Sequence, residues 1–214
     1  MTDSDIPSVE QSTERTSTQR AERFFNGAVG VSLLAWAILG WVQFPFSGVR
    51  LAVSTLNVTV GLLFLTRRCE VQAASWTHHV RCIPSLLAVG LLFRLAPEGH
   101  AWPIGLQVLF GGATLFVIAA FLSLGRSFAV LPSLRVIRRS GLYRVVRHPA
   151  YLGELVMSGC CAVAAASIGA GLLFALLVAG LVLRIAAEEE LLTTDRAYRA
   201  YQGVVRWRLV PKLW

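Results

Sequence analysis

Two short groups of polar residues interrupt an otherwise apolar C-terminal half. The first is Arg147-His148-Pro149, and the second is Arg184 with Glu188 four residues further on. Residues i and i+4 project from the same face of a helix, so the guanidinium and the carboxylate of the second group would lie side by side. A guanidinium grips a carboxylate or a phosphate through two parallel hydrogen bonds. This spacing predicts either a structural ion pair or a site for an anionic ligand, and the residues alone leave both open.

Glu154 and His148 are two further candidates in this half. An acid inside an apolar segment is a functional hypothesis by default. Glu154, however, stands one turn from the predicted membrane boundary and could equally pair with Arg147 or Arg144. His148 precedes a proline, which disfavours helical backbone at the histidine and marks the start of a helix. A single histidine there is more often a structural hydrogen-bonding group than a catalyst.

Other kinds of site find little support in the residues. Glu188-Glu189-Glu190 is a run of like charges that is typical of a solvated helix turn, and Glu190 is assigned to that role. The pair His78-His79 has no carboxylate or cysteine beside it, and the four cysteines lack metal-ligand spacing, so no metal site is predicted. No glycine-rich nucleotide-binding fingerprint occurs in the sequence.

The elements that must position these residues are membrane helices. The chain of 214 residues is 55% hydrophobic and only 15% charged, and its mean hydropathy is +0.61. A soluble domain of this size needs more charge to cover its surface. A bilayer core about 30 Å thick takes roughly 20 apolar residues per helix. We therefore expect an all-α, polytopic transmembrane protein of about six spans, at residues 24–44, 50–66, 82–96, 102–124, 150–167 and 170–187.

The last two spans are joined by residues 167–170 alone, so they should form a tight helical hairpin. A helix rises about 1.5 Å per residue, so the chain crosses, turns and returns to its starting face near Arg184. Since packed helices lie roughly 8–10 Å apart, Arg147-His148-Pro149 should neighbour Arg184 and Glu188. Beyond the hairpin, apolar residues at helical spacing predict an amphipathic helix along the membrane surface. These residues are Leu191, Thr194, Tyr198, Tyr201 and Val205.

Most of the 20 basic residues fall in segments that alternating spans would place on one side of the membrane. Arg50 and Arg94 fall on the other side, and Arg184 lies within a helix. By the positive-inside rule, both termini and the polar groups should face the cytoplasm. The arginines also favour membrane lipid headgroups, and not nucleic acid, as partners. The basic segments are 1–23, 67–81, 126–147 and 196–212.

Three parts of the chain follow from these patterns. Residues 1–23 are rich in Ser, Thr, Gln and Glu without apolar periodicity, and they are predicted to be a disordered polar tail. Residues 24–124 hold the N-terminal transmembrane helices. Residues 125–214 hold the groups that could carry chemistry, together with the hairpin and the amphipathic helix. Nothing in the sequence predicts an oligomeric state.

The second half also resembles a known family, the isoprenylcysteine carboxyl methyltransferases. The resemblance covers about residues 120–212, with its motifs in the family's order and spacing. The matching segments are Leu124-Gly125-Arg126-Ser127-Phe128, Ser140-Gly141-Leu142-Tyr143-Arg144, Arg147-His148-Pro149-Ala150-Tyr151-Leu152-Gly153, Arg184-Ile185, Glu188-Glu189, Leu192, Tyr198, Tyr201 and Arg208-Leu209-Val210-Pro211.

The resemblance implies an integral membrane enzyme that uses S-adenosylmethionine without a Rossmann domain. It implies that Arg184 contacts the substrate, and Arg184 and Glu188 are taken as the catalytic pair. Glu154, a candidate from its position in an apolar segment and not from the resemblance, is a second candidate for substrate binding. Eukaryotic members have a histidine where Arg135 stands, a change that a backbone contact would tolerate. The implied cofactor contacts are Arg135, Val136, Ile137, Arg138, Tyr143, His148, Pro149, Ala150, Tyr151 and Glu188.

The implied reaction agrees with the residues present. Methyl transfer from a sulfonium is an in-line displacement that mainly needs alignment and desolvation. A carboxylate acceptor is already nucleophilic and needs no base. The expected substrate is lipophilic or prenylated, with the carboxylate of an isoprenylcysteine-like molecule as the preferred acceptor.

Two alternatives remain. Related membrane methyltransferases act on phospholipid amines or small thiols, for which Glu154 could serve as a base. A non-catalytic transporter or lipid-binding scaffold would explain the arginines, but not the ordered match at Arg184 and Glu188.

Overall fold

The computed structural model describes residues 9–43, 46–67, 72–73, 76–125, 133–134 and 139–214. The described residues form seven α-helices, two 3-10 turns and one short antiparallel pair of strands. The strands, β1 (Gln72–Ala73) and β2 (Ser133–Leu134), are two residues long each. The helices are α1 (Val9–Gln43), α2 (Gly48–Thr66), α3 (Trp76–Leu95), α4 (Ile104–Leu124), α5 (Pro149–Ala165), α6 (Ile168–Leu192) and α7 (Arg196–Val204), and the turns are η1 (Gly99–Ala101) and η3 (Gly141–Arg144).

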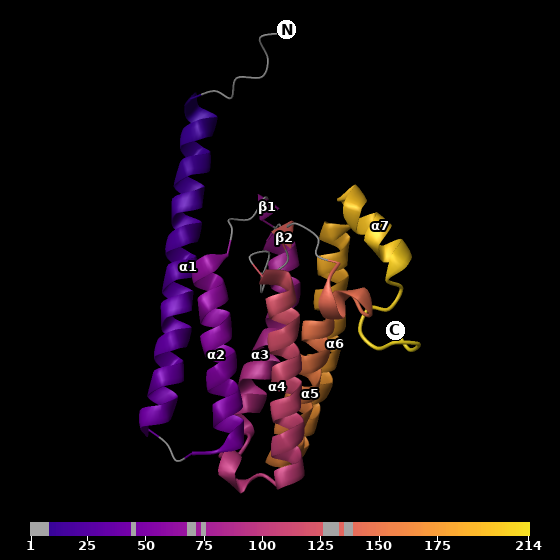
Figure 1. Ribbon diagram of the computed structural model, residues 1–214. Helices are drawn as coiled ribbons and strands as arrows, with labels where there is room; N and C mark the ends of the chain where they lie inside the picture. The colour runs from indigo at the N-terminus through magenta and orange to yellow at the C-terminus, as the bar shows by residue number, and fades with distance from the viewer. Residues whose placement is uncertain (1–8, 44–45, 68–71, 74–75, 126–132, 135–138) are drawn as a thin grey trace.

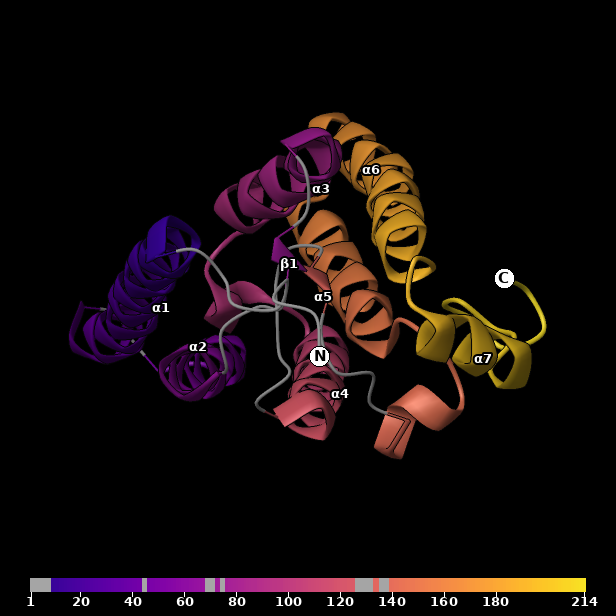
Figure 2. The ribbon, with the colours of Figure 1, turned by 90° about the horizontal axis from the view of Figure 1, so that it is seen from above.

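Six long helices run up and down in alternation, so the start of α1 and the short helix α7 lie at the same end of the bundle (Figure 1). Helices α1 and α2 pack as a pair at one edge, and α2 also contacts α4 (Figure 2). Helix α5 lies in the middle, in contact with α3, α4 and α6. Helix α3 packs along α6, which completes the bundle. The helices that carry the candidate residues, α5 and α6, are therefore held on several sides.

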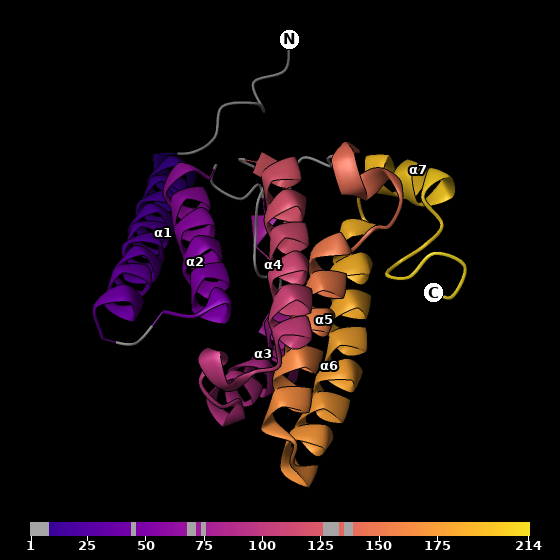
Figure 3. The same ribbon diagram turned by 60° about the horizontal axis from the view of Figure 1, so that its bottom comes forward.

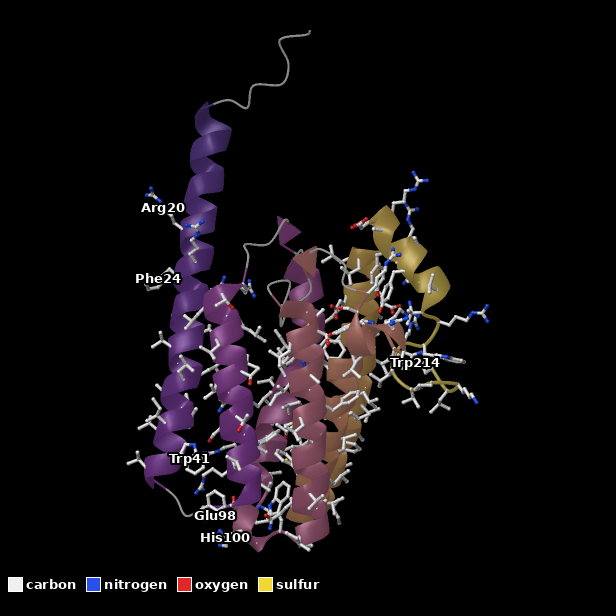
Figure 4. The ribbon with its side chains drawn as sticks, viewed as in Figure 1. Arg20, Phe24, Trp41, Glu98, His100 and Trp214 are labelled. Atoms are coloured by element: carbon white, nitrogen blue, oxygen red, sulfur yellow. The ribbon has the colours of Figure 1, made fainter. Side chains whose placement is uncertain are left out.

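The outside of the bundle is apolar, whereas its two ends carry polar side chains. Exposed side chains include Phe24, Trp36, Leu115 and Ile168, each at least 66% exposed. Soluble monomers seldom expose large contiguous apolar patches. Figure 4 shows Arg20 near one end of the bundle and Glu98 and His100 at the other. This distribution is that of an integral membrane protein.

Among the described residues, four helices are long and apolar enough to cross a bilayer: Arg23–Val42 within α1, then α2, α4 and α6. Helix α5 is apolar but has only 17 residues. Helix α3 has Pro84 in its interior and Arg94 in its last turn. A helix thus stands at each of the six predicted spans, which confirms the helical membrane architecture, while the count of six crossings stays a prediction.

The N-terminal helix begins earlier than predicted. Residues 9–23, expected to belong to a disordered tail, are helical in the structure because α1 extends back to Val9. Once the apolar segment from residue 24 has formed a helix, each added residue gains a hydrogen bond without a new nucleation step. Glutamate, glutamine and arginine, which supply eight of the fifteen residues from 9 to 23, all favour helix. A polar composition was therefore a poor indicator of disorder in this segment.

One glycine, Gly153, sets how closely α4 and α5 approach each other. A Cβ atom added at Gly153 would collide with the Val117 side chain and lie 3.3 Å from the Ala113 carbonyl oxygen. One added at Gly159, on the same helix, would meet only Phe174 side-chain atoms at 3.5 Å, an ordinary contact distance. Gly153 is thus the position at which the α4–α5 interface requires glycine.

We expect Gly153→Ala to lower the thermal unfolding temperature in detergent, because the added methyl group forces α5 away from α4. Overpacking of this kind typically costs about 1–3 kcal/mol. Gly159→Ala is the matched control, since it gains the same roughly 1 kcal/mol of helix propensity without a clash. The measurement is the unfolding temperature of both variants followed by circular dichroism. Equal shifts in the two variants would contradict the packing argument.

Candidate active site

The predicted hairpin is present and has a two-residue turn. Helix α5 ends at Ala165, Ala166 adopts a left-handed conformation with φ 46°, and α6 begins at Ile168. The Ser167 side chain caps α6 by accepting a hydrogen bond from the Ala170 amide at 3.2 Å. At the other end, His148 precedes α5 with φ −127° and ψ 57°, outside the helical region. The turn therefore returns α6 to the level at which α5 began.

This return brings the start of α5 against the end of α6. The Tyr151 hydroxyl donates a hydrogen bond to Glu188 Oε2 at 2.7 Å, and His148 Nδ1 lies 3.7 Å from the same oxygen. The rings of His148 and Tyr151 are stacked, with centroids 5.5 Å apart and an interplanar angle of 6°. The expected proximity of Arg147-His148-Pro149 to the Glu188 turn is confirmed.

Arg184 is buried one turn below Glu188, with 3% of the residue exposed. Its guanidinium carbon lies 4.6 Å from the centroid of the Tyr151 ring, a cation–π distance. Its Nη1 lies 3.5 and 3.4 Å from the two carboxylate oxygens of Glu154. Of the two interpretations left open for Glu154, the structure thus favours neither a pair with Arg147 nor one with Arg144, because its carboxylate faces Arg184. Glu154 and Arg184 occupy facing positions of the hairpin, whereas Arg147 pairs with a different carboxylate.

That other carboxylate belongs to Glu189, whose importance the sequence reasoning missed. Glu189 is 4% exposed, and its carboxylate forms an ion pair with Arg147 Nη1 at 3.0 Å. It also accepts hydrogen bonds from His148 Nε2 at 3.1 Å and from Arg208 Nε at 2.9 Å. Successive helix positions are about 100° apart, so the run of three acids faces different surroundings. Glu190 is exposed and pairs with Arg81 at 2.6 Å, consistent with its assignment to the solvated face.

The segment after α7 runs beside the start of α5, and Figure 3 shows α7 at this end of the α5–α6 hairpin. The Arg147 amide donates to the Trp207 carbonyl oxygen and the His148 amide to that of Arg208, both at 2.9 Å. Residues 147–148 and 207–208 are thus tied together through their backbones. Glu189 adds the side-chain link between the same two segments.

Helix α7 stands where an amphipathic helix is predicted, and its buried residues pack onto the protein itself. Tyr198, Tyr201, Val205 and Leu192 form one buried cluster. The Tyr201 hydroxyl donates to the Tyr143 carbonyl oxygen at 2.7 Å. Burial raises the pKa of Tyr201 to about 12, so its hydroxyl stays a donor at neutral pH. The placement of α7 along a membrane surface stays a prediction.

The contribution of this hydrogen bond to stability can be measured by removing the hydroxyl group of Tyr201, with removal of the hydroxyl group of Tyr198 as the matched control. We expect Tyr201→Phe to lower the free energy of unfolding by about 1–2 kcal/mol, because the buried Tyr143 carbonyl loses its donor. Tyr198→Phe should cost little, since its buried hydroxyl has no hydrogen-bond partner among the described residues. Thermal unfolding of both variants in the same detergent gives the comparison. A larger loss for Tyr198→Phe would show that the pair has been assigned the wrong way round.

The structure gathers most of the predicted cofactor residues at this one end of the bundle. Tyr143 lies in η3 and is 8% exposed, while Pro149 and Ala150 form the buried first turn of α5. With His148, Tyr151 and Glu188 they surround the junction of the hairpin with the C-terminal segment. Arg135, Val136, Ile137 and Arg138 lie outside the described residues. Binding of S-adenosylmethionine by any of these residues stays a prediction.

Comparison with known proteins points to the same part of the chain. The model of the isoprenylcysteine carboxyl methyltransferase (ICMT) family matches residues 103–194, which run from the start of α4 to just beyond α6. No curated protein matches the chain. The family match contains Arg147-His148-Pro149, Glu154, Arg184 and Glu188. All of them lie where the start of α5 packs against the end of α6, at the open end of the hairpin. The stretch that holds the candidate site therefore matches the isoprenylcysteine carboxyl methyltransferase family, and this match supports a membrane methyltransferase.

Proposed function

We propose that the protein transfers the methyl group of S-adenosylmethionine to the carboxylate of a lipophilic, isoprenylcysteine-like acceptor at the junction of α5 and α6. The observation that carries the proposal is the position of Arg184. This buried guanidinium lies 4.6 Å from the Tyr151 ring and one turn from Glu188, within the segment matched by the family. A buried arginine beside aromatic and acidic groups is suited to binding an anion.

The residues at the junction fit S-adenosylmethionine. The bound molecule supplies a methyl group on a positively charged sulfur, together with an ammonium group, a carboxylate and ribose hydroxyls. The Glu188 carboxylate suits a cation or a hydroxyl donor, and the electron-rich face of Tyr151 suits a positive charge. The first turn of α5, at Pro149 and Ala150, places a helix N-terminus where a carboxylate is favoured. The residues 135–138 are the remaining proposed contacts.

Arg184 would orient the acceptor carboxylate. Glu154 contacts its guanidinium through one nitrogen, Nη1, at 3.4 and 3.5 Å, the long end of the hydrogen-bond range. A substrate carboxylate that approached both terminal nitrogens would make shorter, paired hydrogen bonds and could displace Glu154. The apolar tail would lie between helices, within the membrane. The chain then needs only to hold the carboxylate in line with the methyl group and to exclude water.

One observation favours a second candidate. Glu154 is a carboxylate held beside Arg184, and its side chain is 23% exposed. For a neutral acceptor, such as a phospholipid amine or a small thiol, Glu154 would accept the proton that the acceptor loses. Phospholipid N-methylation or thiol S-methylation is therefore the alternative reaction at the same site.

Transfer of a labelled methyl group to three acceptors in parallel tests the proposal. The purified protein would be given labelled S-adenosylmethionine with a farnesylcysteine analogue, phosphatidylethanolamine or a small lipophilic thiol. Label on the farnesylcysteine analogue alone is the expected result. Label on the amine or thiol alone would replace the proposed reaction by the alternative. Saturable binding of S-adenosylmethionine separates an enzyme of any of these types from a transporter or scaffold.

We also propose that the end of the bundle that carries α7 faces the cytoplasm, with both termini on that side. The exposed arginines Arg20, Arg144, Arg196 and Arg206 support this orientation, since the positive-inside rule concerns short segments next to spans. The same side chains suit anionic lipid headgroups. Protease cleavage of a C-terminal tag in inside-out vesicles, but not in right-side-out cells, is the expected result. Cleavage on the outer face would reverse the orientation.

A further inference from the structure

Glu189 joins three segments that are far apart in the sequence. It lies near the end of α6, and its carboxylate contacts Arg147 and His148 before α5 and Arg208 after α7. Its neighbour Glu188 faces Tyr151, and its other neighbour Glu190 is exposed and paired with Arg81. Glu189 therefore differs from both adjacent acids in contacting His148 and the C-terminal segment together.

The contact with His148 determines which ring nitrogen carries the proton. A carboxylate can only accept, so His148 Nε2 must donate to Glu189 Oε1 across the 3.1 Å contact. The ring is thereby held with Nδ1 turned toward Glu188, 3.7 Å from its Oε2. A hydrogen bond from one ring nitrogen of a histidine to a carboxylate sets both the tautomer and the orientation of the ring. Here that nitrogen is Nε2 and the carboxylate is that of Glu189.

The orientation of the His148 ring affects the residues proposed to bind the reactants, because the ring packs against Tyr151. The His148 ring is parallel to that of Tyr151, whose hydroxyl donates to Glu188 and whose ring lies under the Arg184 guanidinium. If the imidazole rotated, Tyr151 would lose one face of its packing.

We propose that Glu189 is a positioning residue of the methyltransferase site, which acts by holding His148 in the Nε2-protonated form parallel to Tyr151. The proposal rests on the proposed function of the site. The two oxygens of Glu189 have different partners: Oε1 forms the ion pair with Arg147 and accepts from His148, and Oε2 accepts from Arg208. A glutamine at this position could still accept from His148 through its amide oxygen, whereas a leucine has no acceptor and loses all three contacts.

The test combines the state of the His148 ring with binding of S-adenosylmethionine. The protein has 4 histidines, so ¹⁵N-histidine labelling gives a simple spectrum in which His148→Gln identifies the His148 signals. These signals and the calorimetric Kd for S-adenosylmethionine would be measured for the wild-type protein, Glu189→Leu, Glu190→Leu and Arg208→Gln. Glu190→Leu is the matched control, because it makes the same change at the adjacent exposed position.

We expect wild-type His148 to be protonated at Nε2, and Glu189→Leu to move both ring signals and raise the Kd at least tenfold. Glu190→Leu should change neither, and Arg208→Gln should leave the ring signals in place, because Oε1 still accepts from His148. An Nε2 without a proton in the wild-type protein would overturn the proposal without any variant. Unchanged ring signals in Glu189→Leu, or equal changes in Arg208→Gln, would reduce Glu189 to a structural ion pair. Failure of the wild-type protein to bind S-adenosylmethionine would instead refute the proposed function, since the ring signals are measured without it.

Discussion

Arg184→Ala is expected to abolish methyl transfer, with a fall in kcat/KM of at least about 10²-fold, while the Kd for S-adenosylmethionine stays nearly unchanged. Removal of one preorganised charged donor from an active site commonly costs about 10²–10³ in rate. Here the guanidinium is proposed to orient the acceptor carboxylate, and it lies over the ring of Tyr151. The measurement is labelled methyl transfer to the farnesylcysteine analogue, with calorimetry of cofactor binding on the same sample.

Two further variants make this prediction specific. Arg184→Ala leaves the Glu154 carboxylate without the guanidinium that now faces it, so some loss of stability is expected. Arg184→Ala combined with Glu154→Gln restores the charge balance, and it should regain stability without regaining turnover. Arg81→Ala removes an exposed arginine that pairs with Glu190, and it should leave turnover unchanged. Turnover retained in Arg184→Ala would remove Arg184 from the reaction.

Glu188→Gln is expected to have the opposite profile and to weaken binding of S-adenosylmethionine about 10- to 100-fold. The amide oxygen can still accept the Tyr151 hydrogen bond, so the local packing is kept. The negative charge that suits a cationic ligand is lost, and hydrogen bonds to charged groups contribute about 1.5–3 kcal/mol. At saturating S-adenosylmethionine, turnover should recover most of its wild-type value, which separates this role from that of Arg184.

Calorimetry in detergent measures the effect of Glu188→Gln directly, and Glu190→Gln supplies the control. Both variants remove one negative charge from the end of α6, but Glu188 is 4% exposed and Glu190 is exposed. A Kd that rises equally in the two variants would mean that the overall charge of this end matters, and not the contact made by Glu188. An unchanged Kd in Glu188→Gln would exclude Glu188 from cofactor binding.

The part of the site that could be predicted is the part governed by local geometry. A connection of four residues between two apolar segments forces a hairpin, and the constant rise of a helix then fixes which residues meet. For this reason the proximity of His148 to Glu188 followed from the sequence. The i, i+4 spacing placed Arg184 on the same side of α6 as Glu188 for the same reason.

The part that could not be predicted depends on contacts between distant segments. Glu189 pairs with Arg208, nineteen positions later and beyond a separate helix, and no local pattern reports such a contact. Its only sequence signal is the adjacent Glu188 in a run of acids, which is typical of solvated turns. The Glu154–Arg184 pair was not among the alternatives considered for Glu154, because it depends on the facing position on α6 and not on distance to the membrane boundary. The N-terminal extension of α1 was missed because composition does not measure helix propagation.

The proposed carboxyl methylation is tested most directly by the chemical stability of the product. Labelled S-adenosylmethionine and a farnesylcysteine analogue would be incubated with the purified protein, and the lipophilic product would be treated with alkali. A methyl ester releases its label as volatile methanol, whereas a methylated amine or thiol keeps it. We predict that nearly all transferred label becomes volatile, and that Arg184→Ala produces none. Alkali-stable label in the lipophilic product, or no transfer at all, would contradict methylation of a carboxylate beside Arg184.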